Sequence, residues 1–399
     1  MSKEKKILPF VSLLVVILIS ANLRAPITCV GPVLDDISTS LGLSAFQGSL
    51  LTSIPLLMFA AFSIPVSRVS AGSALRLMLL FSVLLMIFGL LLRVQGTTAA
   101  LFAGSVLVGF GICVGNVLLP PYIRNNFQNK VGLLTGVFSV SMAIFAAAGA
   151  GFSRAIGEKT GYGWRGALGF WAVISVFAAA VVITDFIVNK KTADSGKPGF
   201  ISQKINVYQS PTAWYISVFM GLQSLVYYCA VAYFPKISIG YGIPPEHSGY
   251  LVAVMQVISL PFTFYAPILA GKARNLKPMI FFVSIFMAAG VLLLLLFQGR
   301  FIFLAAAFIG LSTGTSFSLA ILLFSLKSRS MAATIRMSGM AQSLGYLVAS
   351  AGPPLFAAFR NGQSWLYSYL FLLFTIGLIA FFGFKAASGK FIDDEAVKK

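Results

Sequence analysis

A few polar side chains stand inside long apolar segments of this chain, and they are the residues best suited to bind a ligand. Arg24 lies within the first apolar segment. Its guanidinium presents a planar fork of N–H donors that suits an anion or an electron-rich nitro group. An arginine in the middle of a membrane costs about 2.5–3.5 kcal/mol on insertion scales, so it usually faces the protein interior or a water-filled cavity. The alternative is that Arg24 extends to the membrane surface or donates to backbone carbonyl groups of a neighbouring helix.

Amide and tyrosine side chains inside other apolar segments are the remaining candidates. Gln223 and Tyr227 are four residues apart and would share one helical face. Gln342 and Tyr346 repeat that spacing, and Tyr228 could stack on a flat ring. Polar groups that converge on an apolar pocket form a small-ligand site; alternatively, the amides only join helices and the tyrosines only pack. The candidate binding residues are Asn22, Arg24, Asn116, Gln223, Tyr227, Tyr228, Gln256, Gln342 and Tyr346.

The chain has few residues that could take part in enzymatic chemistry. The single histidine, His247, lies between two apolar segments. Among the ten acidic residues only Asp185 lies within an apolar segment, near its end, where we expect it to be solvated. The three cysteines, Cys29, Cys113 and Cys229, are far apart inside apolar segments and are interpreted as small buried hydrophobic residues. We therefore expect no metal or other cofactor, no disulfide and no enzymatic activity.

The segments that carry these residues are long enough to cross a membrane. Hydrophobic residues make up 58% of the 399-residue chain and charged residues 10%, against about 25% charged in a soluble domain. The sequence predicts an all-α membrane protein with 12 transmembrane helices, each able to cross a hydrocarbon core of about 30 Å. The expected spans are 8–33, 45–67, 75–94, 99–122, 131–153, 165–188, 213–235, 246–270, 277–297, 301–326, 332–357 and 364–385.

The basic residues are distributed as in a protein whose loops set its membrane orientation. The net charge is +19, but Lys and Arg form short clusters between apolar segments, so we expect a lipid bilayer as partner and no nucleic acid. Most lie at the N-terminus, in the even-numbered loops and in the C-terminal tail, whereas the odd-numbered loops hold few, such as Arg93 and Arg154. Both termini are therefore expected in the cytoplasm. The N-terminal segment resembles a signal peptide without a cleavage site, and we interpret it as an uncleaved first helix.

The two halves of the chain are related by an internal repeat. A fixed offset of 201 residues aligns Gly89 with Gly290 and Trp164 with Trp365, together with the basic position between the second and third spans of each half. Because six spans is an even number, the two repeats would have the same orientation in the membrane. The predicted organisation is a six-helix bundle at residues 1–188, a cytoplasmic linker at 189–211, and a second six-helix bundle with a cytoplasmic tail at 212–399.

Parallel six-helix repeats are the design of the major facilitator superfamily, in which the solute binds between the halves and the halves rock about it. Several motifs resemble one branch of that superfamily, the cyanate/2-nitroimidazole permeases. They are Asn22-Leu23-Arg24-Ala25-Pro26 in the first span, Gly115-Asn116-Val117-Leu118-Leu119-Pro120 in the fourth, Ser224-Leu225-Val226-Tyr227-Tyr228 in the seventh, and Ser338-Gly339-Met340-Ala341-Gln342-Ser343-Leu344-Gly345-Tyr346-Leu347 in the eleventh. The loop between spans two and three keeps the basic ends of the superfamily signature but lacks its acidic residue.

The resemblance implies a multi-pass secondary transporter of the bacterial inner membrane, working by alternating access and most simply as a monomer. Two solutes remain open: a cyanate-like anion with Arg24 as its charge partner, or a neutral nitroimidazole-like heteroaromatic. An efflux pump for drugs or metabolites is the alternative within the same fold. Since no strong acidic or histidine candidate lies inside the membrane, the sequence favours facilitated diffusion or exchange over proton coupling.

Overall fold

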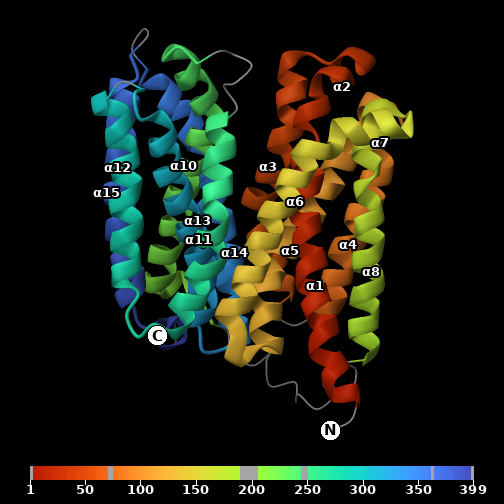
Figure 1. Ribbon diagram of the computed structural model, residues 1–399. Helices are drawn as coiled ribbons and strands as arrows, with labels where there is room; N and C mark the ends of the chain where they lie inside the picture. The colour runs from red at the N-terminus through yellow and green to blue at the C-terminus, as the bar shows by residue number, and fades with distance from the viewer. Residues whose placement is uncertain are drawn as a thin grey trace. The chain divides into compact units, whose positions relative to one another are not determined.

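The computed structural model describes residues 3–70, 75–188, 205–243, 250–297, 299–360 and 364–396, which are helical nearly throughout and contain no β-strand (Figure 1). The backbone divides into two compact units. Unit 1 comprises Met1–Asn129 and Val137–Lys204, and unit 2 comprises Lys130–Gly136 and Ile205–Lys399. Most of the predicted linker, residues 189–204, lies outside the described residues.

The helices of the first half are α1 (Lys3–Thr28), α2 (Leu34–Leu41), α3 (Ala45–Ser70), α4 (Leu75–Arg93), α5 (Thr98–Asn126), α6 (Val131–Thr160), α7 (Gly163–Gly169) and α8 (Trp171–Val188). Those of the second half are α10 (Pro211–Gly240), α11 (Tyr250–Lys272), α12 (Lys277–Phe297), α13 (Ile302–Leu326), α14 (Met331–Ala358), α15 (Leu366–Ser388) and α16 (Ile392–Ala396). The short helices α2 and α16 were not expected, and the sixth expected span is divided into α7 and α8.

The twelve-span, all-α prediction is confirmed. Among the described residues, ten helical segments are long and apolar enough to cross a membrane. Helices α3 and α14 supply the other two spans. The strongly apolar part of α3 is limited to Ser53–Arg68, and α14 is rich in small and polar residues and contains Arg336. Such a composition suits a helix that packs among other helices rather than against lipid.

Close helix contacts repeat at the sequence offset of 201 residues. In unit 1, a Cβ atom at Gly89 of α4 would lie 2.8 Å from the backbone carbonyl oxygen of Gly104 in α5. In unit 2, a Cβ atom at Gly290 of α12 would lie 2.9 Å from the carbonyl oxygen of Ala305 in α13. The 201-residue offset relates Gly89 to Gly290 and Gly104 to Ala305. The two units therefore use the same glycine position to bring corresponding helices together.

A buried carboxylate joins four helices near one end of unit 1. Asp185 of α8 accepts hydrogen bonds from Arg76 Nε of α4 at 2.7 Å, Ser12 Oγ of α1 at 2.7 Å and Tyr122 Oη of α5 at 2.9 Å. The Arg76 guanidinium also donates to Asn126 Oδ1 at 3.0 Å. The expectation that Asp185 is solvated is wrong, because its side chain is 1% exposed. The partners compensate the cost of burying its charge.

The C-terminal helix α16 caps two longer helices of unit 2. Glu395 accepts hydrogen bonds from the backbone N–H and the hydroxyl of Thr212, both at 3.1 Å, at the start of α10. Asp393 accepts from the backbone N–H groups of Arg329 at 2.6 Å and Ser330 at 3.0 Å, where α14 begins. Carboxylates at these positions satisfy N–H groups that a helix leaves without partners and oppose the positive end of its dipole. We call this arrangement the C-terminal clamp.

Candidate functional site

The candidate residues differ in whether a solute could reach them. Four of the nine are half-buried, and the other five are buried. The half-buried residues are Arg24, Tyr227, Tyr228 and Gln256. The buried residues are Asn22, Asn116, Gln223, Gln342 and Tyr346. Only the half-buried side chains expose surface that a ligand could contact. Burial therefore divides the candidates into two groups that the sequence alone could not distinguish.

The two candidate asparagines of unit 1 form hydrogen bonds within that unit. Asn22 of α1 donates from Nδ2 to the carbonyl oxygen of Leu18 at 2.8 Å, and its Oδ1 accepts from Ser175 Oγ of α8. Asn116 of α5 donates to the carbonyl oxygen of Ile112 at 3.2 Å. Both asparagines are at most 3% exposed. Asn22 therefore links α1 to α8, which matches the alternative in which amides hold helices together.

Arg24 lies on α1 within the apolar span Phe10–Val33. A second arginine supports the same segment: Arg93, at the end of α4, donates from Nη1 to the carbonyl oxygen of Pro26 at 2.8 Å. Arg93 is 2% exposed, so its assignment to an outer loop is wrong. It ends an apolar run, and the sequence shows neither its burial nor its partner on α1. Its bond holds the backbone two residues beyond Arg24.

In unit 2, the amide of Gln223 is held between α10 and α13. Its Nε2 donates to Ser224 Oγ at 2.7 Å and to the carbonyl oxygen of Met220 at 3.0 Å. Its Oε1 accepts a long hydrogen bond from Ser316 Oγ of α13 at 3.4 Å. Ser316 was not among the expected polar residues, because a serine inside an apolar run is too common to single out. Both functional groups of the Gln223 amide are thus engaged.

A half-buried amide–aromatic group forms where α10 faces α11. Gln256 of α11 donates from Nε2 to Tyr227 Oη at 3.1 Å. The rings of Tyr227 and Tyr228 meet edge to face with centroids 5.3 Å apart. All three residues are half-buried, and the hydrogen bond joins Gln256 and Tyr227 across two helices. A flat ring could contact the tyrosines while the amide and hydroxyl provide polar contacts.

Helix α14 packs closely on α10 and carries an unsatisfied amide. A Cβ at Gly221 of α10 would lie 2.9 Å from Val348 Cβ and 3.1 Å from Gly345 Cα. On α14, Gln342 is 1% exposed, and its Oε1 has no hydrogen-bond partner in the described part of the chain. The Ser338 hydroxyl, one turn earlier, is also buried and has no hydrogen-bond partner among the described residues. Buried polar atoms without partners are uncommon, and they often mark a functional position.

The chain matches known proteins over most of its length. A model of the Major Facilitator Superfamily matches residues 13–353. The chain is 34% identical to the uncharacterized transporter YycB of Bacillus subtilis strain 168, over 94% of this chain and 92% of that protein. It is 29% identical to the 2-nitroimidazole transporter of Escherichia coli K12, over 94% and 95%. It is 27% identical to the cyanate transport protein CynX of Escherichia coli K12, over 86% and 88%.

The fold also matches solved structures. The structure of the proton:xylose symporter XylE bound to 6-bromo-6-deoxy-D-glucose superposes with a TM-score of 0.76 and covers 99% of this chain and 100% of that chain. The sequences are only 14% identical, so this likeness concerns the fold alone.

Proposed function

Because this chain belongs to the major facilitator superfamily and resembles its cyanate/2-nitroimidazole branch, we propose that it carries a small planar solute across the bacterial inner membrane. The protein is a multi-pass membrane transporter of small solutes and not an enzyme. The proposed solute is a cyanate-like anion or a nitroimidazole-like heteroaromatic. Transport by alternating access is the mechanism that the superfamily's parallel repeats support.

The observation that carries this proposal is the position of Arg24. Arg24 is a half-buried residue inside the apolar span Phe10–Val33, and a charged residue at such a position commonly marks a solute pathway. A small anion would gain charge-assisted hydrogen bonds from the planar donor fork, and a nitro group would gain weaker ones. Arg24 is aligned by the 201-residue repeat with Leu225, so the charge is not part of the shared scaffold.

Each of the other candidate residues has a proposed role that follows from its burial or its contacts. Tyr227, Tyr228 and Gln256 contact a flat solute through their exposed surfaces, and Gln342 supplies an amide oxygen whose hydrogen-bonding capacity is unused. The remaining candidates position the helices that carry these groups: Asn22, Asn116, Gln223 and Tyr346.

The proposals about the whole chain rest on the internal repeat and the charge distribution of its sequence. The repeats at residues 1–188 and 212–399 act as the two moving halves, residues 189–211 connect them, and both termini lie in the cytoplasm. We propose that one copy of the chain is sufficient for transport and that it requires no cofactor.

Transport assays in proteoliposomes test the role of Arg24. Radiolabelled cyanate and 2-nitroimidazole are supplied in parallel to vesicles containing the wild type, Arg24→Ala, Arg24→Lys or Arg154→Ala. Arg154 is the matched control because its side chain is 66% exposed and pairs with Glu158 on the same helix. We expect Arg24→Ala to lower cyanate transport about tenfold or more, since a hydrogen bond to a charged group contributes about 1.5–3 kcal/mol.

The possible results distinguish between the two solutes and test whether Arg24 belongs to the binding site. Loss of cyanate transport in Arg24→Ala with partial retention in Arg24→Lys supports the anion. Transport of 2-nitroimidazole with little dependence on Arg24 supports the heteroaromatic, and Tyr227→Ala should then raise KM. Unchanged transport of both solutes in Arg24→Ala removes Arg24 from the site, and transport of neither solute by the wild type contradicts the proposed substrate class.

A further inference from the structure

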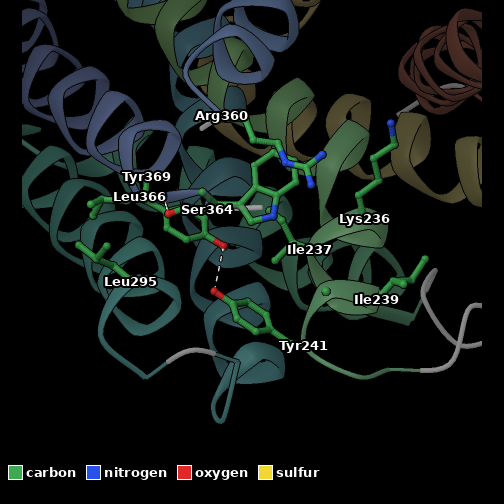
Figure 2. Close-up of a pocket in the computed structure, with 11 residues that line it drawn as sticks. Lys236, Ile237, Ile239, Tyr241, Leu295, Arg360, Ser364, Leu366 and Tyr369 are labelled. Atoms are coloured by element: carbon green, nitrogen blue, oxygen red, sulfur yellow. Dashed lines mark hydrogen bonds between the residues drawn. The ribbon is translucent and has the colours of Figure 1, made fainter. Parts of the chain in front are cut away.

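Unit 2 contains a cavity of about 600 Å³ at the end opposite its C-terminal clamp (Figure 2). The end of α10, the end of α12 and the start of α15 contribute to its walls, which include Ile237, Leu295 and Leu366. Lys236 lies nine residues beyond Tyr227, about 13 Å further along α10 at 1.5 Å per residue. The cavity is therefore separate from the residues proposed above to bind the transported solute.

Two cations line this cavity without a carboxylate among the described lining residues. They are Lys236 and Arg360, and neither forms an ion pair within the part of the chain that the structure describes. The Lys236 ammonium lies 5.9 Å from the centre of the Tyr233 ring, and the Arg360 guanidinium lies 4.5 Å from the centre of the Trp365 ring. These aromatic contacts orient the cations, and they leave the N–H donors available for an anion.

Aromatic groups form the inner part of the same cavity. Trp365 is 8% exposed, and the Tyr241 and Tyr369 hydroxyl oxygens lie 3.4 Å apart. Figure 2 shows the Tyr241 and Tyr369 hydroxyl groups facing each other. The cavity thus combines charged donors at its rim with apolar and aromatic walls. A bare triatomic anion is far smaller than this space, whose volume is within the range of about 300–1,000 Å³ usual for organic ligands.

One of the two charges, that of Lys236, is not part of the scaffold that the two halves share. The 201-residue offset aligns Trp365 with Trp164, but it aligns Lys236 with the acidic residue Asp35. A residue needed only for packing at this position would have no reason to change the sign of its charge between the repeats. The indole and the basic position of Arg360, which aligns with Lys159, belong to the shared framework, whereas the positive charge of Lys236 is particular to unit 2.

We propose that this cavity binds an organic anion with an apolar body, at a site separate from the transported solute. Lys236 and Arg360 contact the anionic group, and Trp365 and the neighbouring aliphatic side chains cover the apolar body. The same chemistry is found in a free aromatic carboxylate and in an anionic phospholipid, whose phosphate and acyl chains would occupy the rim and the walls.

Calorimetric titration of the purified full-length protein in a non-ionic detergent tests this site. The probes are 2-naphthoate and dioctanoylphosphatidylglycerol, and each has a control of equal size without net negative charge: 2-naphthamide and dioctanoylphosphatidylcholine. The test variant is Lys236→Gln/Arg360→Gln. The charge-matched control is Arg154→Gln/Lys159→Gln, which removes two exposed cations from unit 1, one of them the repeat counterpart of Arg360.

We expect at least one anionic probe to bind more tightly than its uncharged or zwitterionic control. The test variant should weaken that binding at least about tenfold, and the control variant should leave it unchanged. Binding of naphthoate alone identifies a free organic anion, and binding of phosphatidylglycerol alone identifies a lipid. The proposal is overturned if neither anion binds, if the controls bind equally well, or if the affinity survives in the test variant. Because the readout is binding, the result does not depend on the identity of the transported solute.

Discussion

At the scale of single residues, the stability of unit 1 depends on the ion pair between Arg76 and Asp185. Their side chains are 14% and 1% exposed, and the Arg76 Nε to Asp185 Oδ2 distance is 2.7 Å. Asp185→Asn would leave the arginine charge largely buried without its counter-ion. Removing one partner of a buried pair costs about 3–5 kcal/mol, so we expect a large decrease in the unfolding temperature.

The chain provides its own probe for this measurement. Cys29, Cys113 and Cys229 are buried free thiols, so a maleimide dye should react with them mainly when the protein unfolds on heating. Asp36→Asn is the control, because Asp36 is an exposed carboxylate of the same unit. Equal unfolding temperatures for Asp185→Asn and Asp36→Asn would show that the buried network contributes little.

Lys327, just beyond α13, predicts a pH dependence of stability. Burial lowers the pKa of Lys327 below its ordinary value, although the charge of Glu395 partly opposes that shift. Its Nζ donates to the carbonyl oxygens of Ala387 at 2.9 Å and Gly389 at 2.7 Å. Between the folded and unfolded pKa values the unfolded chain binds more protons. The contribution of Lys327 to the free energy of unfolding therefore rises with pH in that window.

The unfolding temperature of the wild type should thus increase relative to that of Lys327→Met as pH is raised from about 7 to 10. Tryptophan fluorescence is the suitable readout, since it does not depend on thiol reactivity. A difference between the two proteins that stays constant with pH, or shrinks, would contradict the sign of this effect.

At the scale of helices, glycine contacts set how closely neighbouring spans approach. A Cβ atom at Gly89 would lie 2.8 Å from both the Gly104 carbonyl oxygen and the Val108 backbone nitrogen. Since backbone atoms cannot rotate away as side chains can, Gly89→Ala should force α4 and α5 apart and cost about 1–3 kcal/mol. Gly377→Ala on α15 is the matched control, because among the described residues no atom outside its own helical backbone and chain neighbours lies within 4 Å of the new methyl group. A smaller loss of thermal stability for Gly89→Ala than for Gly377→Ala would exclude the close contact.

The spans could be predicted from the sequence because their length and apolarity are local properties. The twelve expected helices are present, and the errors lie in short elements. Helix α16 has only five residues, Ile392–Ala396, and includes three carboxylates, so nothing in its composition indicates a helix. Its order depends on contacts with α10 and α14, which are distant along the chain.

The polar contacts could not be predicted, because they join positions far apart in sequence. Asp185 is separated from Tyr122 by 63 residues, from Arg76 by 109 and from Ser12 by 173. The sequence placed Asp185 near the end of a span but could not show that these groups converge on it. The nine candidate binding residues were identifiable as polar residues in apolar segments, whereas their division into half-buried and buried groups required the structure.

At the scale of the whole molecule, the proposed topology places both termini on the cytoplasmic side. Lys390 and Arg154 are exposed, and the predicted spans assign them to opposite sides of the membrane. In a chain whose native cysteines are replaced, Arg154→Cys should react with a membrane-impermeant maleimide added to intact cells. Lys390→Cys should react only after the cells are opened. Labelling of both positions in intact cells would contradict the odd number of crossings predicted between them and the cytoplasmic C-terminus.

The C-terminal clamp has a consequence for how the protein is made. Glu395 and the Thr212 N–H that it accepts from are 183 residues apart, and ribosomes add about 5–20 residues per second. The first helix of the second half therefore waits roughly 10–40 s for its cap, and it does so after insertion into the bilayer has begun. A message truncated just before Asp393 would encode all the spans, yet the backbone N–H groups of Thr212, Arg329 and Ser330 in its product would lack their carboxylate partners.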